Sequence, residues 1–215
     1  MKLFPPVDSL DGGMFLFAYE NYIRDAIHKI KFAHNKDLAG LLSEDVENLF
    51  SDGRILKTLT KFISEAGVSC SCAEKEYKDK IIIQTAEQKR SDREGNSIWL
   101  WSGIPTDPVR LRERGFDLPA ELFSERAQEF GGKWGQLLCR TRRTLPMYGL
   151  SPEERRRNLQ NCFAVTGNVR GKSVMLVDDI FTTGATFSAA ASVLKEAGAV
   201  TVTGLAFCGS VENLR

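Results

Sequence analysis

The chain has 215 residues, of which 42% are hydrophobic and 27% are charged, and this composition excludes a disordered, collagen-like or membrane-spanning protein. Its 29 basic and 28 acidic side chains nearly cancel, so no net field draws the protein to nucleic acid or anionic lipid. Locally the balance differs, because residues 110–157 hold 11 basic and 7 acidic side chains. Spaced arginines of this kind suit a phosphorylated ligand or a nucleic-acid strand, and solvated helix faces explain them equally well.

The cysteines predict a cytoplasmic protein without a structural metal site. Five cysteines are scattered along the chain: Cys70, Cys72, Cys139, Cys162 and Cys208. An odd, widely spaced set with no signal peptide is typical of a reducing compartment. Cys70 and Cys72 lack the second pair of ligands that a structural zinc ion needs, and neither His28 nor His34 has a partner at ligand spacing.

The first half of the chain is predicted to be mainly helical. Apolar residues recur at helical spacing over residues 20–62. A polar, charge-dense insertion follows at residues 66–97. The apolar run Ile98–Ile104 then predicts a buried strand that ends at Pro105.

The second half alternates between helices and strands. Residues 117–130 and 132–140 are predicted to be helical, and Ser151-Pro152 marks a further helix start. A strand at 174–177, an alanine-rich helix at 185–197 and a strand at 200–207 form a βαβ unit, which belongs to a parallel sheet.

These elements predict an α/β fold in which helices flank a central, mostly parallel sheet, with a helical N-terminal segment. We divide the chain into an N-terminal helical segment that packs on the core (1–65), the polar insertion (66–97) and the core itself (98–215).

The stretch Val174–Thr186 contains the residues that most specifically indicate a ligand-binding site. Asp178 and Asp179 lie at the C-terminal end of an apolar strand, where ligands of open α/β sheets bind. A short turn then opens a helix, whose first N–H groups lack internal partners and favour an anion. Gly184 lets the backbone approach closely, and the hydroxyls of Thr182, Thr183 and Thr186 add donors, so this turn suits a phosphate.

The two carboxylates suit a different group. The carboxylates would repel a phosphate directly beside them, so another group must separate the two. The vicinal hydroxyls of a ribose fill that role, because they donate hydrogen bonds to carboxylates, which only accept. The alternative is that Asp178 and Asp179 only cap a surface turn. The whole pattern favours recognition of a ribose 5-phosphate.

This stretch closely resembles the phosphoribosyl pyrophosphate (PRPP) signature of type I phosphoribosyltransferases. Other segments are similar to the ComF-type, competence-associated branch of that superfamily: Tyr19–Phe32, Arg114–Asp117, Arg143-Thr144 and Glu154-Arg155 with Asn158. The chain departs from that branch in lacking its four-cysteine zinc element. Purine-salvage relatives carry an acidic residue in the phosphate loop where this chain has Thr182, which speaks against purine salvage.

The resemblance implies a role for each matching position. Asp178 and Asp179 would be catalytic residues that hold the ribose diol. The 5′-phosphate loop would comprise Thr182, Thr183, Gly184, Ala185 and Thr186. The pyrophosphate loop would be Pro105, Thr106 and Asp107, with Arg112 and Arg114 beside the pyrophosphate. The resemblance also implies that Mg²⁺ accompanies PRPP, with no metal-ligating side chains assigned.

Three functions remain open at this stage. The first is a phosphoribosyltransferase that releases pyrophosphate and transfers the sugar to an unknown acceptor. The second is a non-catalytic PRPP-sensing protein that binds single-stranded DNA and takes part in DNA uptake. The third is a vestigial site without a ligand.

Overall fold

The computed structural model describes residues 2–4, 6–51, 58, 99–129, 132–145 and 149–210. The polar insertion predicted at 66–97 lies outside the described residues, and the division of the chain at 65 and 97 stays a prediction.

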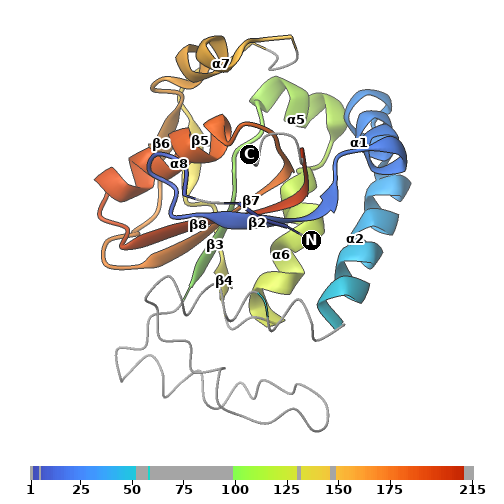
Figure 1. The fold of residues 1–215 in the computed structure, drawn as a ribbon, viewed down its shortest axis with the longest axis horizontal. Coiled ribbons are helices and arrows are strands. Elements are labelled where there is room, and N and C mark those ends of the chain that lie inside the picture. The colour runs from blue at the N-terminus through green and yellow to red at the C-terminus, as the bar shows by residue number, and fades with distance from the viewer. Residues whose placement is uncertain are drawn as a thin grey trace, which may run out of the picture.

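A six-stranded sheet forms the centre of the molecule, with strand order β1-β2-β8-β7-β3-β4 (Figure 1). Its strands are β1 (Lys2–Phe4), β2 (Gly13–Ala18), β3 (Leu100–Gly103), β4 (Lys133–Trp134), β7 (Ser173–Phe181) and β8 (Thr201–Gly209). All neighbouring strands are parallel except β1, which pairs antiparallel with β2. Every residue of β8 is buried, as expected for a strand covered on both faces.

Helices cover both faces of this sheet. On one face lie α1 (Asn21–Ala33), α2 (Lys36–Ser51) and α6 (Leu118–Glu129), and on the other α8 (Ala185–Glu196) (Figure 1). Each face has its own cluster of buried apolar side chains, centred on residues such as Ile27 and Phe123 for the first and Phe187 and Leu194 for the second. The predicted fold class, an α/β fold with a mostly parallel sheet flanked by helices, is confirmed.

A smaller unit stands beside the sheet. It consists of the antiparallel pair β5 (Leu138–Arg140) and β6 (Phe163–Val165) and the helix α7 (Pro152–Leu159) between them. Ser151 caps α7 through a capping box with Glu154, which confirms the helix start read from the sequence. The remaining helix, α5 (Pro108–Arg114), follows β3.

The N-terminal segment contributes strands as well as helices. The apolar run at residues 14–19 forms most of β2, which pairs with β8; this strand was not predicted. The two helices that follow confirm the helical pattern over residues 21–51, with a break at His34, whose φ of 53° ends α1. Gly13 explains the close approach of β2 to β8, because a Cβ there would lie 2.2 Å from the Gly204 carbonyl oxygen.

The prediction of a helix at 132–140 is wrong. This segment forms β4 and β5, with Lys133 and Trp134 paired to Leu100 and Trp101 of β3. Gly132 and Gly135 weaken helix formation here, and pairing with two different strands supplies the hydrogen bonds that a helix would have given. Tertiary pairing therefore overrides the local pattern.

Candidate ribose-phosphate site

The candidate residues lie where β7 extends beyond the end of its neighbour β3. The last residue of β3, Gly103, pairs with Val177, and β7 continues to Phe181. Asp178 and Asp179 therefore lie inside a strand that only β8 still pairs. The predicted strand, 174–177, ended before them and was too short. Because successive side chains of a strand point to opposite faces, the two carboxylates diverge from adjacent positions.

Asp179 points toward α1, where Lys31 meets it. The Lys31 Nζ lies 2.9 Å from Oδ1 and 2.9 Å from Oδ2 of Asp179. Asp179 is only 6% exposed, so this ion pair is largely shielded from water. The Sγ of Cys208, on the neighbouring strand, donates to the Asp179 carbonyl oxygen at 3.3 Å.

Asp178 has a different environment. Its Oδ1 accepts a hydrogen bond of 2.8 Å from the backbone N–H of Asp179. Burial, followed by the negative charge of Asp179, raises the pKa of Asp178 to about 8, and the nearby charge of Lys31 acts in the opposite direction. The neighbouring carboxyl groups thus differ, because Asp179 is paired with a cation whereas burial favours the protonated form of Asp178.

The predicted phosphate loop leads directly into α8. Gly184, with φ of 75°, is the N-cap of this helix, and no described side chain caps it. The hydroxyl of Thr183 is buried and has no hydrogen-bond partner among the described residues. Ala185 and Thr186 form the first turn of α8 and are partly exposed. The structure therefore brings together a left-handed glycine, uncapped N–H groups and an unpaired hydroxyl.

The second predicted loop, at residues 105–107, is held by side chains on both sides. The Thr106 hydroxyl donates to Asp117 Oδ1 at 2.8 Å. The Pro105 carbonyl accepts from the Arg140 Nε at 2.7 Å. Asp107 caps α5 by accepting from the Val109 N–H, and its Oδ2 is buried without a partner among the described residues.

Burial shifts the pKa values of two of these groups. Burial, partly offset by the Thr106 hydrogen bond, raises the pKa of Asp117, and the Asp179 charge acts in the same direction as burial. Desolvation lowers the pKa of Arg140. The Asp179 charge therefore acts on both Asp117 and Asp178.

The two arginines assigned to pyrophosphate are not equivalent. Arg114 is 9% exposed, and its Nε has no partner in the described part of the chain. Arg112 is exposed and its Nε donates to the Pro108 carbonyl of its own helix at 3.2 Å. Of these two arginines, Arg114 is therefore the one that is buried with an unused donor.

Three basic residues contact this region that the site prediction did not include: Lys31, Arg140 and Arg155. Arg155, from α7, has its Nη1 3.4 Å from the Thr182 Oγ1, and its Nε is buried without a partner among the described residues. Both arginines belong to the basic stretch noted in the sequence. Lys31 belongs to a segment quoted only for its resemblance, and nothing local singled it out.

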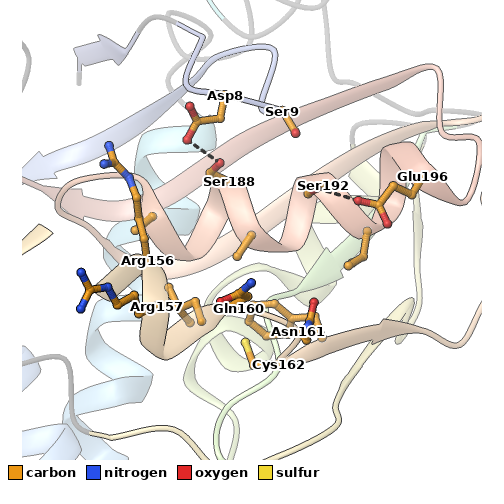
Figure 2. Close-up of a pocket in the computed structure, with 15 residues that line it drawn as sticks. Asp8, Ser9, Arg156, Arg157, Gln160, Asn161, Cys162, Ser188, Ser192 and Glu196 are labelled. Atoms are coloured by element: carbon orange, nitrogen blue, oxygen red, sulfur yellow. Dashed lines mark hydrogen bonds between the residues drawn. The ribbon is translucent and has the colours of Figure 1, made fainter. Parts of the chain in front are cut away.

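A shallow hollow of about 440 Å³ lies elsewhere, on the outer surface of α8 beside α7 (Figure 2). Figure 2 shows Ser188 and Ser192 of α8 facing it, each hydrogen-bonded to a carboxylate, Asp8 and Glu196 respectively. Of the predicted site residues, only Ala185 lines it. This hollow is therefore distinct from the candidate site.

Two negative findings concern metal ions and membranes. Within the described ranges, no three His, Cys, Asp or Glu side chains converge in a way that could hold a metal ion. None of the described helices is long and apolar enough to cross a membrane.

Comparison with known proteins finds relatives over part of the chain. No family model matches. The chain is 36% identical over 107 residues to the DNA utilization protein YhgH of Salmonella typhi, and this match covers 49% of the chain and 44% of the relative. It is 35% identical over 100 residues to YhgH of Escherichia coli O157:H7, covering 46% of the chain and 44% of the relative. The chain therefore spans less than half the length of these relatives.

Solved structures give weaker matches. The allosteric regulatory enzyme of purine biosynthesis has a TM-score of 0.34 at 20% identity, covering 56% of this chain and 24% of that one. The hypoxanthine phosphoribosyl transferase of Trypanosoma cruzi has a TM-score of 0.34 at 14% identity, covering 60% and 62%. Scores at this level support no inference about function.

Proposed function

We propose that this protein is phosphoribosyltransferase-like and ComF-type, and that it binds the ribose 5-phosphate part of PRPP where β7 meets α8. The observation that carries the proposal is the arrangement around Gly184. A left-handed N-cap without a side-chain cap follows a strand whose last residues include two carboxylates. Uncapped N–H groups at a helix N-terminus are suited to a phosphate, and the buried, unpaired Thr183 hydroxyl supplies a further donor.

The sugar would lie between this loop and the carboxylates. Asp179 pairs with the Lys31 ammonium, and a carboxylate in such a pair would accept hydrogen bonds from the sugar hydroxyls. The raised pKa of Asp178 favours its protonated form, which would donate to a ribose oxygen. The two carboxyl groups would then recognise the diol by different hydrogen bonds.

The reaction proposed is transfer of the phosphoribosyl group. The bond between the anomeric carbon and the pyrophosphate oxygen breaks, a bond from an acceptor nucleophile forms, and pyrophosphate leaves with the bonding electrons. Stabilisation of that departing anion is the main task. Arg114 and Arg140 are the candidates for it, because Arg114 has an unused buried donor and Arg140 holds the 105–107 loop.

Magnesium is proposed to arrive with PRPP. The described residues form no metal cage of their own, so the ion would be held chiefly by ligand oxygens and water, as Mg²⁺ commonly is in phosphate-binding sites. Its chemistry there would be to neutralise charge on the pyrophosphate.

The experiment that tests turnover is a pyrophosphate-release assay with PRPP, Mg²⁺ and a panel of nitrogen and oxygen nucleophiles. Release that depends on one acceptor and is lost in Asp179→Asn would support the transferase. PRPP binding without release across the panel would favour a non-catalytic sensor instead.

A DNA partner is a second candidate function. The relatives that match slightly less than half of this chain are named DNA utilization proteins. Arg142, Arg143 and Arg156 are exposed on the unit formed by β5, β6 and α7. Contacts from such arginines to phosphates weaken steeply as salt rises. Fluorescence anisotropy with a labelled single strand at two salt concentrations tests this candidate, and binding that is absent or indifferent to salt would contradict it.

A further inference from the structure

The strongest unexplained contact in the candidate site is the ion pair between α1 and β7. Lys31 and Asp179 are 148 residues apart, and the lysine ammonium reaches both carboxylate oxygens at 2.9 Å. The lysine side chain is 27% exposed and the aspartate side chain 9%. A two-oxygen contact with a mostly buried carboxylate fixes the plane of that carboxylate, which an exposed ion pair does not.

The surroundings explain why a cation is needed at this place. Besides burial, the charge of Asp179 raises the pKa values of two other carboxyl groups, those of Asp178 and Asp117. Burying an ionised carboxylate without a partner is costly. Lys31 is the cation that contacts Asp179 in the described part of the chain.

The other groups facing this pair are weak acids. Tyr19, at the end of β2, senses both Lys31 and Asp179, and burial raises the pKa of its hydroxyl. Burial also raises the pKa of the Cys208 thiol, with the Asp179 charge acting in the same direction and Lys31 opposing it. Both groups are therefore neutral at physiological pH and cannot replace the lysine as the counter-charge.

We infer that Lys31 is a positioning residue of the ribose site: it holds the Asp179 carboxylate in one orientation and supplies its counter-charge, so that the carboxylate is ready to accept the sugar hydroxyls. This inference rests on the proposed function. A carboxylate has about four lone-pair positions, and the ammonium uses only part of them, so the remaining positions are left for hydroxyl donors. The arrangement also connects the site to α1, which is otherwise a covering helix.

The experiment compares three variants of the full chain. Lys31→Met removes the charge and keeps the apolar stem, Lys31→Arg restores a cation, and Lys29→Met is the matched control because Lys29 is exposed on the same helix. Circular dichroism and thermal unfolding establish that each variant is folded.

Two readouts are taken. The first needs no ligand: carboxyl ¹³C NMR follows the titration of Asp178, whose pKa Lys31 lowers. Lys31→Met should move that titration to higher pH, while Lys31→Arg and Lys29→Met leave it near the wild-type position. The second is calorimetric titration with PRPP, in which Lys31→Met should bind at least about tenfold more weakly, Lys31→Arg should recover most of the loss, and Lys29→Met should match the wild type.

The outcomes separate the two proposals. Absence of PRPP binding by the wild type would overturn the proposed function, and the ribose role of Lys31 with it. Wild-type binding together with an unchanged affinity of Lys31→Met would overturn the Lys31 inference alone. A loss of affinity that Lys31→Arg does not restore, without any movement of the Asp178 titration, would also overturn it, because only a structural role then remains.

Discussion

The β7–α8 segment and the β5–α7–β6 unit supply the candidate site in different ways. In the first, nine strand residues, a three-residue loop and a helix follow one another, and the groups that would meet a sugar phosphate are close in sequence. In the second, Arg140 and Arg155 reach the same place from separate elements. The site residues of the first segment can be predicted from the sequence. The contribution of the second unit is evident only in the folded structure.

The largest effect is expected at the centre of the first segment. Asp179→Ala leaves the Lys31 ammonium without its partner and removes the proposed sugar acceptor. We expect the free energy of unfolding to fall by about 2 kcal/mol and PRPP binding to be lost. Urea unfolding and calorimetry measure both, with Asp37→Ala, an exposed position on α2, as the control. A variant as stable as the control would contradict the importance given to the ion pair.

Asp178→Asn should change how stability depends on pH. The wild-type pKa of Asp178 is raised to about 8, so between about pH 4 and pH 8 the folded state keeps a proton that the unfolded chain has released, and wild-type stability falls as pH rises. Asparagine removes this term. We expect the variant to gain about 4 kcal/mol relative to the wild type between pH 5 and pH 8. An equal difference in unfolding free energy at both pH values would show that Asp178 titrates normally.

Arg155→Ala tests whether the second unit reaches the phosphate loop. The guanidinium lies 3.4 Å from the Thr182 hydroxyl, and a charged donor beside a phosphate strengthens its binding. We expect affinity for ribose 5-phosphate to fall by about tenfold. Arg156→Ala is the control, because Arg156 is exposed on the same helix, and equal affinities of the two variants would place the site on the first segment alone.

Gly184→Ala is expected to have the smallest effect. The φ of 75° is strained for alanine, and a Cβ would lie 3.1 Å from the Phe181 ring. We expect a loss of about 1 kcal/mol in the free energy of unfolding. Gly40→Ala, in the middle of α2 with no atom within 4 Å of the new Cβ, should instead stabilise the protein by up to about 1 kcal/mol. Thermal unfolding of the pair gives the sign of each, and equal signs would contradict this reading of Gly184.

The fold was predictable where local pattern and tertiary pairing agree. The β7–α8–β8 unit, the capped start of α7 at Ser151 and the helices at 21–51 follow from apolar periodicity and capping residues alone. The pattern failed at residues 132–140, where β4 and β5 take their hydrogen bonds from distant strands. It also failed to identify β2, because periodicity alone does not distinguish a strand from a buried helical segment in a short apolar run.

The candidate site divides in the same way. Asp178, Asp179 and the Thr182–Thr186 loop lie where a single contiguous motif indicates. The partner of Asp179 could not be predicted, because nothing near Lys31 in sequence distinguishes it from Lys29 on the same helix. Arg114 is buried and Arg112 is exposed. In so short a helix, residue type and spacing do not predict which of the two is buried.

The most direct test of the central claim is calorimetric titration of the wild-type protein with ribose 5-phosphate and, separately, with ribose. The phosphate loop and the carboxylates together predict that ribose 5-phosphate binds and that ribose, which lacks the anion, binds at least about a hundredfold more weakly. Equal affinity for the two sugars, or no heat from either, would contradict the assignment of a ribose-phosphate site to the end of β7.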